Sequence, residues 1–510
     1  MRIASVILVG PDTAGARCVA LAVVMLTAAC TLGPDYRSPD PLGVTQYTAI
    51  PVVEQTASAP GPGGEAQRLV YGRDIPAEWW KAFQSEALDE LIRKALADSP
   101  TLVKTQARLR QAQEQLAART GQNFPKIDAG LSGYGIGITP ENLGGTNLPV
   151  NSPLNLYLAT INISYTLDLF GSQRRELEAL RSAVDYQRFE IEAARLMLAG
   201  NVVTSVIREA LLRERITRIE EVIALQARQL VIIEQRQRTG AIPVVHLAQH
   251  RGALAQTRAV LPELRLQLEQ VRHRLAVYLG RPPGLEMLPE FRLADLRLPS
   301  EVPVSVPSEL ARRRPDIQAA EALLHQASAR VGVATANRFP QLSLSAMLGS
   351  LSTDPANPLW FYFLAGSLVQ PIFNGGALSA KQREAVAAYE QAGAAYKEVV
   401  LQGFREVADS LRALEADAIR LRERTEAASQ SRLAYDITRK RYETGAVSHL
   451  SVLETQQQYQ QAAMEQAQAT ADRYANTAAL FQALGGGWWS KGDRRNGDSG
   501  PSVNPQSVDK

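Results

Sequence analysis

One uninterrupted run constrains this chain more than any other feature. The 67 residues from Ser172 to Arg238 contain no proline and a single glycine, Gly200. Hydrophobic residues recur in it every seven positions, and one step of eighteen residues, two heptads plus four, interrupts the repeat, as in a coiled coil with a stutter. A continuous helix of this length would extend about 100 Å, so it must pack sideways along its whole length. The heptad positions are Leu177, Val184, Ile191 and Leu198, followed by Ile216, Ile223 and Leu230.

The same run occurs twice. Gly171 and Gly240 flank the first copy and Gly376 and Gly445 the second, each pair 69 residues apart, so the copies are in register at an offset of 205 residues. The tripeptide Thr-Gly-Ala contains the second glycine of both pairs. Agreement at both ends indicates an internal duplication, with two similar halves folded into one elongated body.

The N-terminal 29 residues have the pattern of a secretory signal peptide, with Arg2 and Arg17 before an apolar run that ends in small residues at Cys30. This ending resembles a bacterial lipobox, which implies cleavage before Cys30 and attachment of lipid, including palmitate, to that residue. An ordinary signal peptide cut nearby is the alternative. Thr31, where an aspartate would imply retention in the inner membrane, implies the outer membrane. Residues 30–75 are rich in Pro, Gly, Ala and Ser and predict an extended, lipid-anchored tether.

After residue 125 the apolar period changes from helical to two. The alternation from Tyr157 to Leu167 extends over about eleven residues, the length of a tilted strand that crosses a bilayer. It predicts a β-hairpin at about 127–168, and the matching region of the second half predicts another at about 341–370. The sequence after Cys30 contains no run of eighteen apolar residues, so a membrane crossing would use strands. The predicted lipid-facing residues are Tyr157, Ala159, Ile161, Ile163, Tyr165 and Leu167, and Asn162, Ser164 and Thr166 are predicted to face water.

Each half therefore consists of helices, a hairpin, a long helix, a tight turn and a returning helix. The predicted order is the signal peptide (1–29), the tether (30–75), the first repeat (76–280, with a long helix at 172–238 and a return helix at 244–279), a proline-rich linker without helix or strand (281–307), the second repeat (308–485, with a long helix at 377–443 and a return helix at 448–484) and a disordered tail (486–510).

Short motifs spread over nearly the whole mature chain point to a known family. They resemble those of TolC-like outer-membrane efflux lipoproteins, in the NodT/OprM-like branch, which are the outer-membrane factors of RND-type tripartite pumps. The motifs are Leu32-Gly33-Pro34-Asp35-Tyr36, Trp79-Trp80-Lys81-Ala82-Phe83, Arg313-Arg314-Pro315-Asp316-Ile317 with Ala319-Ala320-Glu321, and Gln370-Pro371-Ile372-Phe373 before Gly375-Gly376.

The resemblance implies a mainly α fold with a membrane β-barrel. Four strands per chain are too few to close a barrel, and open strand edges are not tolerated in lipid, so closure requires more chains. The family resemblance implies a homotrimer with a twelve-stranded barrel, which continues as a long α-helical barrel through the periplasm. Polar residues on the second face of each strand would then line water.

The implied function is a passive exit duct for drugs or other small toxic compounds, with a role in antibiotic resistance. An inner-membrane RND-type transporter would energise it, and a periplasmic adaptor would join the two. Two alternatives stay open: a type I protein-secretion duct, and a lipid-anchored periplasmic coiled coil with a structural or adaptor role. The alternating strand favours a channel. The net charge of +3 does not indicate nucleic acid, and neither a catalytic constellation nor a cofactor motif is visible, so no enzyme is predicted.

The turn after the second long helix carries the predicted gate. In related channels a leucine and an acidic residue four positions later form rings around the threefold axis at the periplasmic mouth, with an arginine three residues further on. Leu450 and Glu454 match this pattern, whereas Gln457 replaces the arginine. The resemblance therefore implies a gate at Leu450 and Glu454 that lacks one salt-bridge partner.

Three other groups have simpler interpretations. His246 and His250 are four residues apart, but no third ligand is evident, so they are predicted to be solvated near a turn rather than to bind a metal. Arg312-Arg313-Arg314 is predicted to belong to a structural turn that opens the second repeat. Trp79-Trp80 is predicted to pack in the interior.

Overall fold

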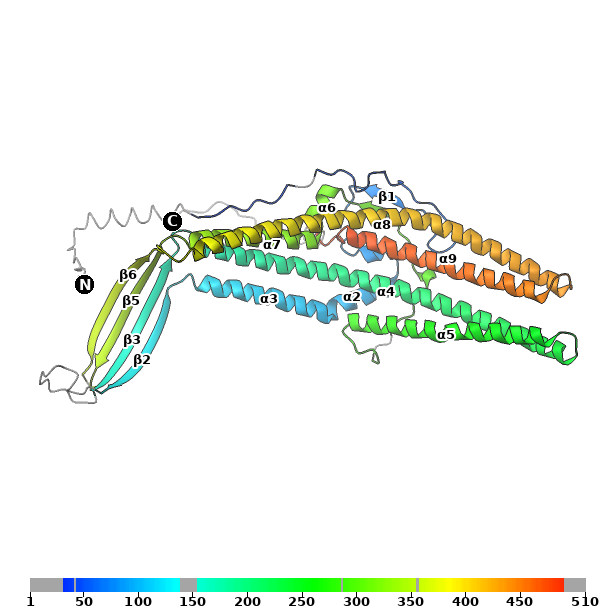
Figure 1. Ribbon diagram of the computed structural model, residues 1–510, viewed down its shortest axis with the longest axis horizontal. Coiled ribbons are helices and arrows are strands. Elements are labelled where there is room, and N and C mark those ends of the chain that lie inside the picture. Colours follow the sequence, from blue (N-terminus) through cyan, green and yellow to red (C-terminus); the bar gives the residue numbers. More distant parts are fainter. Residues whose placement is uncertain (1–30, 41–42, 138–153, 286–287, 355–356, 490–510) are drawn as a thin grey trace, which may run out of the picture. The chain divides into compact units, whose positions relative to one another are not determined.

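The computed structural model describes residues 31–40, 43–137, 154–285, 288–354 and 357–489 (Figure 1). The predicted signal peptide, Cys30 and most of the loop within the first hairpin lie outside these residues. The chain divides into two compact units. Unit 1 combines residues 1–39, 109–187 and 320–396, and unit 2 combines residues 40–108, 188–319 and 397–510. Both long helices contribute residues to both units, so the units cut across the two sequence repeats.

Unit 1 contains a four-stranded antiparallel sheet in the order β2-β3-β5-β6 (Figure 1). β2 (Lys126–Ile136) and β3 (Leu154–Leu167) form the first hairpin, and β5 (Gln341–Ser352) and β6 (Leu359–Val369) form the second. β3 pairs with β5 and so joins the two hairpins. The predicted hairpins are therefore confirmed.

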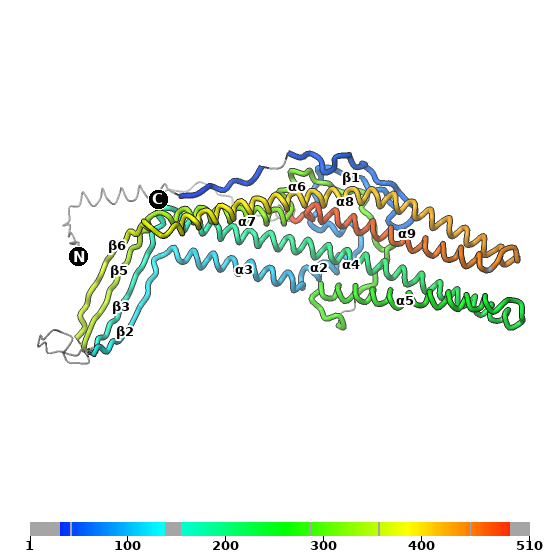
Figure 2. The backbone as a smooth tube through the Cα atoms, viewed as in Figure 1, coloured from blue at the N-terminus to red at the C-terminus, as the bar shows by residue number. Residues whose placement is uncertain are grey.

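Two helical hairpins follow the strands, and Figure 2 shows their paths. α4 (Ser172–Arg238) and α8 (Ala377–Glu443) each have 67 residues and the predicted bounds. α5 (Val244–Tyr278) and α9 (His449–Ala483) return from tight turns. Gly240 and Gly445 have φ values of 74° and 77° in these turns, a conformation that favours glycine. Among the helices of the described residues, none is long and apolar enough to cross a membrane.

The core of unit 2 is built on aromatic side chains near the middle of the long helices. η1 (Trp79–Phe83), a 3-10 helix, precedes α2 (Glu86–Asp98) and α3 (Pro100–Gly121), and α3 continues into unit 1. Trp79 is buried and stacks on Phe481 of α9, with ring centroids 5.5 Å apart. The packing role predicted for Trp79-Trp80 is confirmed, because both side chains belong to this core.

A short parallel pair of strands corrects the predicted linker and refines the tether. β4 (Glu301–Val304) lies within residues 281–307, where neither strand nor helix was predicted, and η3 (Leu293–Asp295) lies there too. β4 pairs with β1 (Arg68–Tyr71), which lies at the end of the tether. Pro303 is tolerated because β4 pairs on one side only.

The arginine cluster before Pro315 has the structural role predicted. Arg314, buried between α6 (Pro307–Arg313) and α7 (Pro315–Ala336), donates to the carbonyl oxygen of Ala483 at 2.8 Å and to the carboxylates of Asp316 and Glu406, each at 2.7 Å. The guanidinium thus ties the start of the second repeat to α8 and to the end of α9.

The start of the predicted disordered tail is ordered, which corrects the prediction for residues 486–489. The indole N–H of Trp488 donates to the carbonyl oxygen of Arg313 at 2.7 Å. The guanidinium of Arg313 lies over the ring of Trp489, 5.1 Å from its centroid. Two aromatic rings bury more surface than the neighbouring polar residues can, so these positions pack although their surroundings are glycine-rich.

Candidate functional site

The register of the sheet gathers apolar side chains on one face. Ile161 of β3 is opposite Ala129 of β2 and Leu348 of β5, and Leu348 is opposite Tyr362 of β6. Residues directly opposite one another point to the same side of a sheet, so this row crosses all four strands. Ile161, Leu348 and Tyr362 are 46%, 49% and 78% exposed. An apolar face of this extent needs an apolar surrounding.

The other face is largely polar. Asn162 is opposite Asp128, and Thr166 is opposite Ser343, with 3.4 Å between their hydroxyl oxygens. The exceptions include Leu158 of β3, Met347 of β5, and Phe361 and Phe363 of β6. The described sheet therefore separates an apolar side from a mainly polar one, with the same residues on each face of β3 that the sequence predicts.

The N-terminal segment is fixed to unit 1 where β3 passes into α4. The backbone N–H of Leu32 donates to the carbonyl oxygen of Phe170 at 3.2 Å. Arg175, with a side chain only 5% exposed, donates to Glu178 at 2.8 Å and to Asp35 at 2.7 Å. The segment also approaches α7 closely, because a Cβ added to Gly33, which has a φ of 102°, would lie 2.4 Å from the Cα of Gly332.

Tyr36 and His325 extend this attachment. Their rings stack with centroids 4.1 Å apart, and the Nε2 of His325 lies 2.9 Å from Glu178. The hydroxyl of Tyr36 donates to Glu321 at 3.2 Å. Burial opposes ionisation of Glu178, but its contacts with Arg175 and His325 outweigh burial and lower its pKa. The carboxylate of Glu178 is thus held ionised between two donors.

The helix tips carry the predicted gate residues. Leu450 and Glu454 lie one turn apart at the start of α9, both exposed, and Gln457 is exposed further along the same helix. A second contact near the tips was not predicted. Arg236 in the last turn of α4 donates to the hydroxyl of Tyr442 in the last turn of α8 at 3.0 Å. This hydrogen bond joins the two helical hairpins. The sequence could not predict it, because the two residues lie on different helices.

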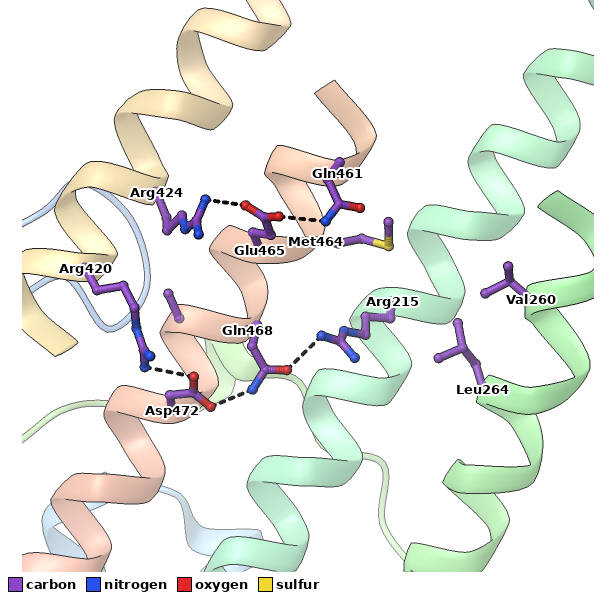
Figure 3. A pocket seen from close by; sticks show the side chains of 11 residues that line it. Arg215, Val260, Leu264, Arg420, Arg424, Gln461, Met464, Glu465, Gln468 and Asp472 are labelled. Atoms are coloured by element: carbon purple, nitrogen blue, oxygen red, sulfur yellow. Dashed lines mark hydrogen bonds and ion pairs between the residues drawn. The ribbon is translucent and has the colours of Figure 1, made fainter. Parts of the chain in front are cut away.

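Four helices of unit 2 line an open cavity of about 380 Å³. In Figure 3 a chain of contacts crosses three of them: Arg420 of α8 binds Asp472 of α9, Asp472 accepts from Gln468, and Gln468 accepts from Arg215 of α4. Arg424 and Glu465 form a second ion pair between α8 and α9. Apolar side chains complete the lining, namely Val260 and Leu264 of α5 and Met464 of α9.

His246 and His250 lie four residues apart on α5. The described residues contain no group of three or more His, Cys, Asp and Glu residues that could hold a metal ion. His250 is only 4% exposed, so the expectation that it is solvated was wrong. It lies on the face of α5 that also buries Leu254, and burial, followed by the nearby His246, lowers the pKa of His250.

A sheet of four membrane-length strands with an exposed apolar face, in a chain that also has two long helical hairpins, is typical of a membrane protein with a large helical part outside the bilayer. Comparison with known proteins agrees. The family described as Outer membrane efflux protein matches residues 91–281 and 306–486. The pyoverdine export outer membrane protein OpmQ of Pseudomonas putida is 33% identical over 441 residues, which cover 84% of this chain and 92% of that protein.

Two further similarities cover almost the whole fold. The cation efflux system protein CusC of Escherichia coli is 27% identical over 483 residues, covering 92% of this chain and 98% of that protein. The structure of the outer-membrane channel OprN aligns with a TM-score of 0.77 at 28% identity, over 90% of this chain and 100% of that one.

The chain belongs to the outer membrane efflux protein family, a family of channels rather than of enzymes. The predicted fold class, outer-membrane location and efflux function are confirmed.

Proposed function

We propose that three copies of this chain form a passive exit duct for drugs or other small toxic compounds. The observation that carries the proposal is the continuous apolar face of the sheet, with Ile161, Leu348 and Tyr362 in one row. Three such sheets provide twelve strands, enough to close a barrel and to satisfy every edge in lipid. The duct itself performs no catalysis, and the transporter supplies the energy.

We further propose that Cys30 carries lipid. Leu32 lies in unit 1, where its backbone N–H is bonded to Phe170 between the end of β3 and the start of α4. Because Leu32 is held beside the end of β3, a lipid attached two residues earlier in the sequence would insert its acyl chains into the leaflet nearest that end of the strands. This placement supports Cys30 as an anchor that positions the protein rather than as part of the pore.

The periplasmic gate is proposed at Leu450 and Glu454. Threefold symmetry would place three copies of each residue around the axis, an apolar constriction beside a ring of like charges. The hydrogen bond between Arg236 and Tyr442 would hold the two helical hairpins of one chain together in the closed state. This bond would matter more here than in related channels, because Gln457 replaces an arginine that could form a salt bridge at the gate.

Small compounds are favoured over proteins as cargo. The names of the relatives specify pyoverdine export and cation efflux, both of which concern small molecules or ions. A protein-secretion duct is the rival, whereas the structural coiled coil without a channel does not agree with the family to which the chain belongs.

The test is export in cells. A host without its own exit ducts should gain resistance to one or more small toxic compounds when the chain is expressed with its cognate adaptor and transporter. Ile161→Arg should abolish this gain, and the matched variant Asn162→Arg should retain trimers. Unchanged susceptibility to a broad panel of compounds, with trimers present in the outer membrane, would refute the proposal.

A further inference from the structure

α9 has one covered face and one open face in unit 2. On the covered face, the guanidinium of Arg473 donates to the carbonyl oxygen of Gly63 at 2.9 Å, and the hydroxyl of Tyr474 donates to the carbonyl oxygen of Leu296 at 2.8 Å. At 100° per residue, Gln468 and Asp472 lie on the opposite side of the helix. In the proposed duct the transport path must stay open, so the face of α9 covered by irregular segments would be the outer wall, and the opposite face, which lines the cavity, would be the inner wall.

Two arginines on this inner wall have no carboxylate partner among the described residues. Arg208 and Arg215 are seven residues apart on α4 and thus share a face. Arg208 donates to the side-chain oxygen of Gln267 at 3.3 Å, and Arg215 donates to that of Gln468 at 2.7 Å. The Nε of Arg215 is buried and has no hydrogen-bond partner in the described residues.

The acidic groups of the cavity are already neutralised. Asp472 is paired with Arg420 at 2.8 Å, and Glu465 is paired with Arg424. Burial, followed by the like charge of Arg208, lowers the pKa of Arg215, whereas Asp472 raises it. An added anion would therefore relieve the repulsion between the two guanidinium groups.

The remaining walls suit an apolar body beside the charge. Val260, Leu264 and Met464 line the cavity together with Arg215, and the volume of about 380 Å³ is within the range of small-molecule sites. A bare inorganic anion would leave this apolar surface unused.

We propose that the cavity binds amphipathic organic anions, with Arg215 contacting the acidic group and Val260, Leu264 and Met464 contacting the apolar part. The inference rests on the proposed function, because it requires the inner wall of a duct. Three copies in the trimer would place three such sites at one level of the path, so the cargo would include carboxylates or sulfonates with an aromatic or aliphatic body.

The test measures binding of 2-naphthoate to nanodisc-embedded trimers of the mature chain by equilibrium dialysis. 2-Naphthylmethylammonium, a cation of similar shape, is the control ligand. Saturable naphthoate binding should weaken at least about tenfold in Arg215→Gln and should be largely retained in Arg215→Lys, because a charge-assisted contact is lost only in the first variant. Arg218→Gln is the matched control, since Arg218 lies three residues further along α4 and is paired with Glu214.

Equal binding to wild type and Arg215→Gln, or equal binding of the cation, would overturn the proposal. If Arg215→Gln dissociates the trimer, Arg215 serves subunit pairing instead, and the proposal is also overturned. Conductance of the same preparations distinguishes a failure of the anion site from a failure of the duct. Trimers that conduct but do not bind naphthoate contradict this site alone, whereas trimers that do not conduct contradict the duct.

Discussion

The Nη2 of Arg175 donates to the Oδ1 of Asp35 at 2.7 Å and thereby joins the first turns of α4 to the segment that follows the proposed lipid anchor. The Arg175 side chain is nearly buried, whereas that of Asp35 is 91% exposed. The arginine also donates to the carbonyl oxygen of Leu32, so the attachment depends on Arg175 more than on Asp35.

Arg175→Gln is expected to release the N-terminal segment. Loss of a charged donor to several acceptors should cost on the order of 1–3 kcal/mol of local stability, which corresponds to roughly 5- to 150-fold faster amide exchange over residues 31–38. Arg174→Gln is the matched control, because Arg174 pairs with Asp168 instead. Equal protection in both variants would contradict the attachment.

The same attachment should weaken in acid. The pKa of Glu178 is lowered below its ordinary value of 4.5, so the ionised carboxylate stabilises the folded state fully above pH 4.5. This contribution is lost as the pH falls through the lower, folded-state pKa. The protection factors of the amides of residues 31–38, which correct for the pH dependence of intrinsic exchange, should fall over that window in wild type, and Glu178→Gln should flatten the dependence. An unchanged pH profile in Glu178→Gln would assign the effect to other groups.

The two faces of β3 should differ in their tolerance of charge. Arginine in place of Ile161 near mid-bilayer should cost about 2–4 kcal/mol and reduce the yield of detergent-resistant trimers. Arginine in place of Asn162, the adjacent residue on the opposite face, should leave assembly intact and change single-channel conductance. Similar losses of trimer for both variants would contradict the assignment of faces.

The helix tips should control basal conductance. Leu450→Ala should raise it by widening the apolar constriction, and Glu454→Gln should reduce cation preference by removing a ring of charge. Tyr442→Phe should also raise basal conductance, because it removes the acceptor of Arg236 while keeping the ring. Bilayer recordings in which all three variants match wild type would place the gate elsewhere.

Elements with a long periodic pattern could be predicted from the sequence, whereas short elements without one could not. The heptads of α4 and the alternation of β3 repeat over many residues, so their types and bounds follow from local pattern. β1 and β4 have four residues each and pair across more than 200 positions of sequence, which leaves no periodic signal. His250 was expected in solvent because it lies near a turn, but the packing of α5 decides its burial.

The candidate sites divide in the same way. Leu450 and Glu454 follow from a spacing of four on one helix, whereas Arg236 and Tyr442 meet only when two helices that are distant in sequence lie together. The role proposed for Arg215 could not be predicted from its own helix either. It depends on which side chains of α5, α8 and α9 lie next to the guanidinium group.

The most direct test of the account is single-channel recording from purified full-length protein in planar lipid bilayers. We predict discrete conductance steps from trimers, larger in Leu450→Ala than in wild type, and no steps from Ile161→Arg at the same protein concentration. Trimers that insert into the bilayer but pass no current, in wild type and Leu450→Ala alike, would contradict an exit duct.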